Sequence, residues 1–282
     1  MGILSQDLAA LDTDMMQATN RILQQAFKYG LQGDLIFGEC LVADQALMTV
    51  SATKNYHFGT RRVTPYGDVF HYAKNGVALT NAQIDYSLYF AGEHKTAWYV
   101  AFTHTALASA TSVTCTGAAS LVTLNELIGG YIFIMQAGVA NQVIRRITGN
   151  TASEAGSPYD YTVSFAEPLP YAITTSDHFE IMSNPWANVR PAWASPSATH
   201  TMCGYAPATA DANSYIWVKT AGIHRVSLPS TPGDYQRSVY FGANGCCVFR
   251  GTAGTTDLDQ RAGILILPGT EHSAFIMLEL FR

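Results

Sequence analysis

Charged residues are scarce in this chain of 282 residues: Asp, Glu, Lys and Arg together make up only 13% of it, about half the usual share. The basic residues form no run, and the formal net charge is −5. A surface that neutralises nucleic-acid phosphates needs clustered Lys and Arg, so we expect no nucleic-acid partner. Hydrophobic residues make up 48% of the chain, which is enough to fill cores and predicts a folded protein.

Cysteine is also sparse, and the five cysteines include no Cys-x-x-Cys pair. We therefore expect reduced, mostly buried thiols. The adjacent Cys246 and Cys247 would point to opposite faces of a strand, with one of them in the core, which disfavours a metal site made by both. The phosphate-binding loop, the nucleophile elbow and the zinc-protease helix motif are absent, and the eight histidines are scattered. The sequence predicts no enzyme activity, no metal site and no cofactor.

The start of the chain, Met1–Asp7, has neither the basic residues nor the long apolar stretch of a signal peptide. Two uncharged stretches, 96–125 and 127–144, are long enough to cross a bilayer. Ser and Thr fill the first, whereas glycines and amides interrupt the second, so both predict strands joined by turns. We expect synthesis in the cytoplasm of a host and no membrane partner.

An amphipathic helix is predicted from about residue 7 to residue 27, because apolar residues recur there every three or four positions. This apolar stripe consists of Leu8, Leu11, Met15, Ala18, Ile22 and Ala26. Such a helix either packs on its own domain or reaches a neighbouring subunit as an arm, and both alternatives stay open. For the arm, Leu11, Met15 and Ile22 are the candidate interface residues.

From residue 33 onward, short apolar or alternating runs bounded by Gly, Pro, Asn and Asp predict β-strands. The expected fold is mainly β, with two or three small β-barrel or β-sandwich modules and one N-terminal amphipathic helix. We divide the chain into a helical arm (1–32), a β-region (33–105), a middle barrel-like domain (106–187) and a C-terminal β-domain (188–282). The β-region has too few strands to close alone, which favours a joint domain with the C-terminal region.

Several of the expected strands and connections are specific enough to test. The expected strands include 46–50 and 69–73 in the first β-region, 131–135 and 161–165 in the middle domain, and 214–219 and 224–228 as two strands in the last. The final strand, 274–281, alternates too weakly for one exposed face and is expected to be buried on both. The segment 185–207, rich in Pro, Ala, Ser and Asn, is expected to be a linker or crossover.

Three stretches follow one another between residues 58 and 222. The first, Gly59–Gly76, is a turn followed by an aromatic strand; the second, Tyr131–Ala152, includes the pair Arg145-Arg146 and precedes a Pro-Leu-Pro corner at 168–170; the third, Tyr215–Gly222, is another aromatic strand. In their residues and in their order along the chain, these stretches resemble a family of uncharacterised structural proteins of tailed phages, especially aquatic ones. The resemblance implies a component of the virion, of the capsid decoration or cement type, with no catalytic signature.

Candidate interface residues also come from two further patterns. The pairs Arg61-Arg62 and Arg145-Arg146 would each send one guanidinium to each face of a strand. They are either solvated surface pairs, or one Arg of each forms a bidentate salt bridge to a carboxylate of a capsid protein or sister subunit. The aromatic segment 86–102 includes Tyr89, Phe90 and Trp98, which suit either a sheet core or a permanent protein interface.

We therefore expect a non-catalytic virion structural protein that binds the capsid surface as a decoration or cement subunit and stabilises the shell. Its expected partners are the major capsid protein and further copies of itself, as a dimer or trimer, and its expected location is the virion. One alternative is a tail or fibre-base protein that binds a host glycan or neighbouring tail proteins, with Trp186, Trp193 and Trp217 as stacking candidates. Another is a hydrolytic tail enzyme, which would need clustered acids drawn from Asp160, Glu167, Asp177 and Glu180.

Overall fold

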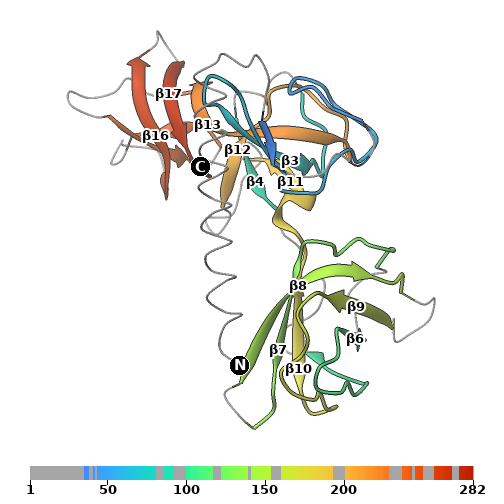
Figure 1. The fold of residues 1–282 in the computed structure, drawn as a ribbon. Helices are drawn as coiled ribbons and strands as arrows, with labels where there is room; N and C mark the ends of the chain where they lie inside the picture. Colours follow the sequence, from blue (N-terminus) through green and yellow to red (C-terminus); the bar gives the residue numbers. More distant parts are fainter. Residues whose placement is uncertain are drawn as a thin grey trace, which may run out of the picture.

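The computed structural model describes residues 35–37, 41, 43–80, 86–91, 100–116, 122–138, 141–153, 160–192, 201–228, 237–242, 245–249, 257–268 and 273–281. These residues form two β-modules, one above the other in Figure 1, joined by a narrow connector. Their two sheets are curled half-barrels, so the expectation of a mainly β protein with barrel-like or sandwich-like modules is confirmed. The predicted helix at 7–27 lies outside the described residues.

The upper module contains, within the described residues, an eleven-stranded sheet that draws on both ends of the chain. The first part of the chain contributes β1 (Leu35–Phe37), β2 (Arg61–Val63), β3 (Val69–Lys74) and β4 (Ser87–Phe90). The last part contributes β11 (Val189–Pro191), β12 (Met202–Tyr205), β13 (Tyr215–Val226), β14 (Ser238–Gly242), β15 (Cys247–Val248), β16 (Asp257–Pro268) and β17 (Ala274–Glu279). The main hydrogen-bonded order is β1-β2-β3-β13-β17-β16-β14-β15, and β12, β4 and β11 branch from β13. The two outer β-regions of the sequence therefore share one sheet.

The lower module contains, among the described residues, six antiparallel strands in the order β5-β10-β7-β8-β9-β6. These strands are β5 (Val100–Ala101), β6 (Ser112–Cys115), β7 (Tyr131–Met135), β8 (Gln142–Asn150), β9 (Tyr161–Phe165) and β10 (His178–Met182). Strand β5 pairs with β10, where Ala101 lies opposite His178. The middle domain therefore begins before residue 106, the boundary expected from the sequence.

The core of the lower module follows from strict alternation along its strands. Ile132 and Ile134 of β7 are fully buried, as is Val163 of β9, while the residues between them face outward. Each such side chain stabilises the fold by about 1.5–3 kcal/mol. The buried cluster consists of Phe102, Val113, Cys115, Val122, Leu127, Ile132, Ile134, Val143, Ile147, Tyr161, Val163, Phe165, Leu169, Ile173, Phe179 and Ile181.

In the upper module, an aromatic core fixes the loop that precedes β2. Trp217 is fully buried, and its ring centroid lies 5.1 Å from that of Tyr56 and 5.1 Å from that of Tyr72. The indole N–H of Trp217 donates to the backbone carbonyl of Gln45 (2.9 Å), and the hydroxyl of Tyr72 donates to the Gln45 side chain (3.0 Å). Because these buried polar groups are paired, the core carries no penalty for them.

Three strand expectations need correction. Residues 46–50 form a turn, in which the N–H of Thr49 donates to the carbonyl of Ala46 (3.0 Å). The two strands expected at 214–219 and 224–228 are the single strand β13. Strand β17 is buried on one face only, since Ile276 is fully buried whereas Phe275 is 42% exposed. Its local alternation was weak because Phe275 and Met277 are apolar on the outward face.

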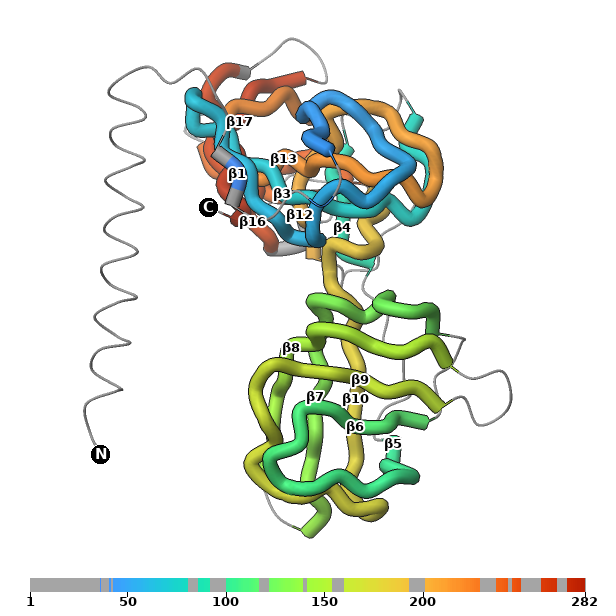
Figure 2. The backbone as a smooth tube through the Cα atoms, turned by 45° about the vertical axis from the view of Figure 1, so that its right-hand side comes forward, coloured from blue at the N-terminus to red at the C-terminus, as the bar shows by residue number. Residues whose placement is uncertain are grey.

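The connector between the modules is much shorter than the linker expected at 185–207. The 3-10 turn η2 (Pro185–Ala187) is capped by Asn184, whose side-chain oxygen accepts from the N–H of Trp186 (3.0 Å). Beyond it, β11 and β12 pair with β4 in the upper sheet, which corrects the linker expectation. The buried residues of β11 and β12 place these strands in the sheet, although the Pro- and Ser-rich composition of the segment predicted a linker. Figure 2 shows this connector in yellow, between the two modules.

Candidate functional site

The predicted interface residues divide into those the structure places and those it does not. Leu11, Met15, Ile22 and Trp98 lie outside the described residues. The others occupy β2, β4 and β8 and are Arg61, Arg62, Tyr89, Phe90, Arg145 and Arg146. The structure does not bring them together, because β8 belongs to the lower module and β2 and β4 to the upper one.

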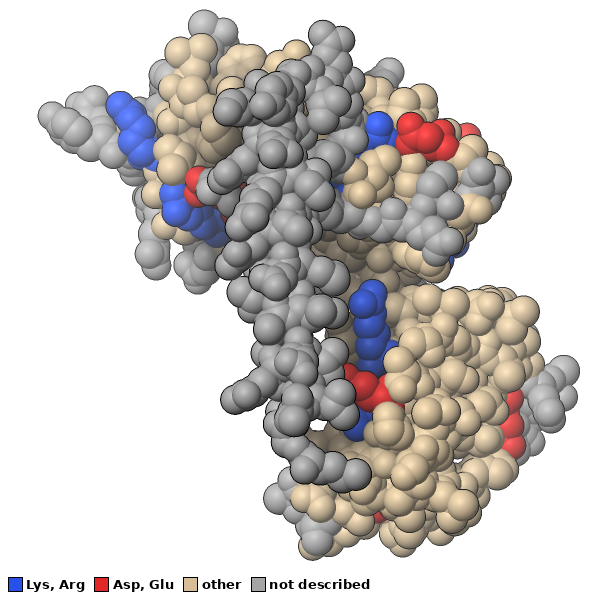
Figure 3. All heavy atoms as spheres, in the orientation of Figure 1, with Lys and Arg blue, Asp and Glu red and all other residues tan. Residues whose placement is uncertain are grey.

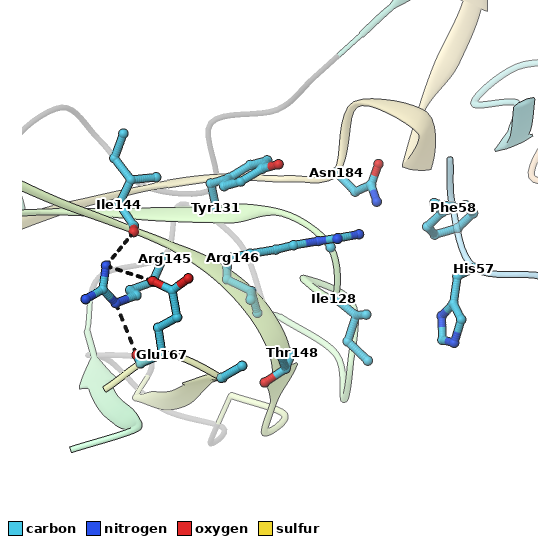
Figure 4. Close-up of a pocket in the computed structure, with 13 residues that line it drawn as sticks. His57, Phe58, Ile128, Tyr131, Ile144, Arg145, Arg146, Thr148, Glu167 and Asn184 are labelled. Carbon is cyan, nitrogen blue, oxygen red and sulfur yellow. Dashed lines mark hydrogen bonds and ion pairs between the residues drawn. The ribbon is translucent and has the colours of Figure 1, made fainter. Parts of the chain in front are cut away.

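Arg145 of β8 fixes the corner that follows β9. Its guanidinium donates to the backbone carbonyls of Glu167 (3.1 Å) and Pro168 (2.9 Å) and forms an ion pair with the Glu167 carboxylate (3.4 Å). Leu169, the next residue of the corner, is buried in the lower core. A salt bridge to a partner protein was one of the two alternatives for this pair, and Arg145 instead pairs with a carboxylate of its own chain. In Figure 4 the neighbouring Arg146 points the opposite way, toward Asn184.

The pair on β2 also makes contacts within its own module. Arg62 is 8% exposed, donates to the carbonyl of Gln45 (2.7 Å) and forms an ion pair with Asp44 (3.3 Å). Its guanidinium carbon lies 5.5 Å from the ring centroid of Trp217, in cation–π geometry. Arg61 lies near His71 and lowers the pKa of that imidazole, after the larger effect of burial. Arg62 therefore supports the aromatic core.

The aromatic residues of β4 pack inside the upper module. The ring of Phe90 meets that of Trp186 edge to face at a centroid distance of 4.8 Å, and it lies 5.8 Å from the ring of Phe281. Tyr89 packs against the core formed by β14, β16 and β17. Trp217 is fully buried, so it cannot stack on a glycan, and Trp193 lies outside the described residues.

A cleft lies between the modules and consists of two cavities that share Phe58 and Ile128. The first has a volume of about 630 Å³ and is drawn in Figure 4. There Phe58 and His57 of the upper module face Ile128 and Arg146 of the lower one. The second has a volume of about 570 Å³. Both volumes fall in the range of small-molecule sites.

The second cavity is lined by three half-buried cations from separate segments of the upper module: Lys54, Lys74 and Arg190. The Lys54 ammonium lies 4.1 Å from the ring centroid of Phe58. Partial burial lowers the pKa of Lys54, because a charged ammonium loses water contacts there. Sequence analysis missed these residues, since they are far apart in the chain and no motif links them.

The acids considered for catalysis do not converge on one cleft. Asp177 accepts hydrogen bonds from the backbone N–H groups of Ala137 (2.7 Å) and Thr174 (2.7 Å), which fixes a turn. Glu167 is held by Arg145, while Asp160 accepts from Thr116 and lies 3.8 Å from His104. Among the described residues no group of three or more His, Cys, Asp or Glu could hold a metal ion.

The described cysteines are all buried, and none of them is in a disulfide bond: Cys115, Cys203, Cys246 and Cys247. Both members of the adjacent pair are buried, whereas one core cysteine was expected. The part of the chain that the structure describes contains no helix long and apolar enough to span a membrane. No protein-family model, curated protein or solved structure matches the chain.

Proposed function

We propose that the chain is a non-catalytic structural subunit of a virion, which binds the capsid surface as a decoration or cement subunit and stabilises the shell. The observation that carries the proposal is an exposed apolar face on β13, β16 and β17. Exposed patches of this kind mark protein interfaces on soluble proteins. The three ordered stretches that resemble phage structural proteins supply the particle context.

This apolar face is built by register across three strands. Ile223 of β13 and Ile264 of β16 both lie opposite Met277 of β17, and they are 54% and 38% exposed. One row further along, Leu267 lies opposite Phe275, and these are 57% and 42% exposed. The other face of the same strands is buried in the core. The sheet therefore presents large apolar side chains on both of its sides.

Charged groups lie at the border of this apolar face. Arg261 of β16 forms an ion pair with Glu279 of β17 (3.7 Å), and Arg225 of β13 lies beside Phe275 in register. An apolar centre with a polar rim is the usual anatomy of a homo-oligomer interface. We assign the apolar face to contacts between copies of this chain, as a dimer or trimer. The surface shown in Figure 3 carries few charged groups on the described residues, which suits a subunit covered by neighbours.

The capsid contact is then made by an oligomer. Several weak contacts on a rigid shell act together, because binding of one copy raises the effective concentration of the next. The major capsid protein is the proposed partner, and the added buried area would resist internal pressure on the shell. Nothing in this mechanism requires a catalytic group.

Copy number in purified virions tests this function. Quantitative gel electrophoresis, with cryo-EM of the same particles, is expected to give a copy number comparable with that of the major capsid protein and density on the outer shell. Only a few copies per particle, located in the tail, would overturn the decoration role.

A second candidate function is a tail or fibre-base protein that binds a host glycan. The cleft between the modules favours it, because one of its cavities combines cations, amides and aromatic rings. The copy-number measurement separates the two positions in the particle.

A further inference from the structure

The second cavity of the cleft has an unbalanced charge. Lys74 ends β3, and Arg190 lies at the centre of β11; neither forms an ion pair with a described residue. The acid among the described lining residues is Glu126, whose carboxylate accepts from the N–H of Thr123 (2.8 Å) and from its hydroxyl (3.1 Å). With Lys54 included, three cations face this single acid, so the cavity has a positive potential.

Arg190 is held in place rather than free to swing into solvent. Its Nε donates to the side-chain oxygen of Asn188 (3.3 Å), and Asn188 in turn donates to the carbonyl of Ala91 (3.3 Å). Both side chains lie over Gly76. A Cβ at that position would come within 2.0 Å of the Asn188 oxygen and 3.1 Å of Arg190 Nε. The guanidinium is therefore positioned before any ligand arrives, which lowers the entropic cost of binding.

Neutral polar groups and rings complete the lining. Asn125 and Asn213 occupy turn positions with φ of 61° and 63°, where asparagine is favoured. The Asn213 side chain makes no hydrogen bond to a described residue, so its amide can both donate to and accept from a ligand. The rings of Phe58 and Tyr215, stacked at a centroid distance of 6.0 Å, form an apolar wall.

We propose that this cavity binds an acidic oligosaccharide. Lys74 and Arg190 hold its carboxylate or sulfate groups, Asn125 and Asn213 hold its hydroxyls, and the wall of Phe58 and Tyr215 contacts its carbons. An acidic peptide could use the same cations, but the two asparagine amides and the wall of rings suit the hydroxyls and carbons of a sugar. The inference rests on the second proposed function and names its ligand class.

Isothermal titration calorimetry on the full chain, in about 150 mM salt to screen long-range attraction, tests the inference. The probes are a galacturonate hexamer, a sulfated oligosaccharide of the same length and a neutral glucose hexamer. We expect at least one acidic probe to bind and the neutral one not to bind. Lys74→Gln and Arg190→Gln are each expected to weaken binding about tenfold, the loss typical of a charge-assisted hydrogen bond. Arg237→Gln removes the same charge at an exposed position that lines neither cavity and is expected to leave binding unchanged.

Specific outcomes overturn the inference. The cavity does not bind acidic sugars if neither acidic probe binds, or if Lys74→Gln and Arg190→Gln bind as well as the native chain while their thermal melts match it. Tighter binding of a glutamate hexamer, a thymidine oligonucleotide or inorganic phosphate would assign another ligand class. These results concern the cavity alone, whereas copy number decides the position in the particle, so the two proposals can fail separately.

Discussion

The indole of Trp186 stacks on the imidazole of His71, with ring centroids 4.8 Å apart and ring planes inclined by 10°. Trp186 belongs to the connector and His71 to β3, so this stack ties the connector to the upper sheet. The stack also desolvates the imidazole. Burial, and then the charge of Arg61, lower the pKa of His71 to about 4. His224, half-buried beside Tyr205, also has a pKa lowered to about 4, by partial burial and by the charge of Lys219.

Because the pKa values of these two histidines are lowered, the folded chain is expected to lose stability in mild acid. An unfolded histidine binds its proton near pH 6.5, whereas His71 and His224 stay neutral down to about pH 4 when folded. Between these values the unfolded state binds more protons. The contribution of these neutral histidines to the free energy of unfolding is therefore fully present above pH 6.5. It falls as the pH drops toward 4, by at most about 1.4 kcal/mol per pH unit for each histidine. Urea denaturation across this window measures the slope.

A matched pair of variants assigns the slope. His71→Gln keeps a polar group near Thr220, whose hydroxyl lies 3.1 Å from the imidazole, but removes one titrating site. It is expected to reduce the slope of the free energy of unfolding against pH by the contribution of about one bound proton. His224→Gln removes the other titrating site and is expected to make the pH dependence shallower by the same amount. An equal slope in His71→Gln and the native chain would contradict the assignment.

Arg145 is expected to be a stability determinant of the lower module. Arg145→Lys keeps the charge but cannot donate to both carbonyls of the corner at Glu167 and Pro168, so it should lower the free energy of unfolding by about 1–3 kcal/mol. Arg146→Lys, at an exposed position on the same strand, should change it by less than about 0.5 kcal/mol. Equal urea midpoints for the two variants would show that the corner does not depend on the guanidinium.

Gly222 is expected to tolerate no side chain. Its φ is +106°, and a Cβ there would lie 1.8 Å from the carboxylate of Asp68, which pairs with Lys219 (3.0 Å). Gly67 has a φ of +85° but nothing within 4 Å of its Cβ position. Gly67→Ala should therefore cost about 1 kcal/mol from backbone strain alone. Gly222→Ala should cost about 2 kcal/mol more, because of the clash. Thermal melts of both variants check the difference.

Local patterns were enough to predict the strands with strict alternation. The runs expected at 131–135 and 161–165 are β7 and β9, because one face of each strand is fully buried. Pattern alone did not place 46–50, where an apolar run forms a turn whose geometry depends on the buried side chain of Gln45. That side chain donates to the carbonyls of Thr49 and Tyr215 (2.9 Å each), and a contact across the sequence leaves no local signal.

The candidate sites were less accessible to sequence analysis than the strands. Arg145 was identified as a candidate interface residue, but its acceptors lie in the Pro-Leu-Pro corner more than twenty residues away. Lys74 directly follows the strand predicted at 69–73, yet its position in a cleft depends on how the two modules are joined. Arg190 lies in a segment expected to be a linker. Charge clusters formed by folding cannot be recognised from spacing when their members belong to separate segments of the chain.

The apolar face of β13, β16 and β17 predicts self-association through the C-terminal strands. Met277→Glu places a carboxylate at the centre of that face, between Ile223 and Ile264, where pairing with another copy would bury an unpaired charge at a cost of several kcal/mol. The variant should therefore be monomeric in sedimentation velocity, whereas the native chain is expected to sediment as a dimer or trimer. Leu107→Glu changes a leucine that is 80% exposed in the lower module and should keep the native mass. A native chain that stays monomeric, or a Met277→Glu variant that still associates, would assign the apolar face to another partner.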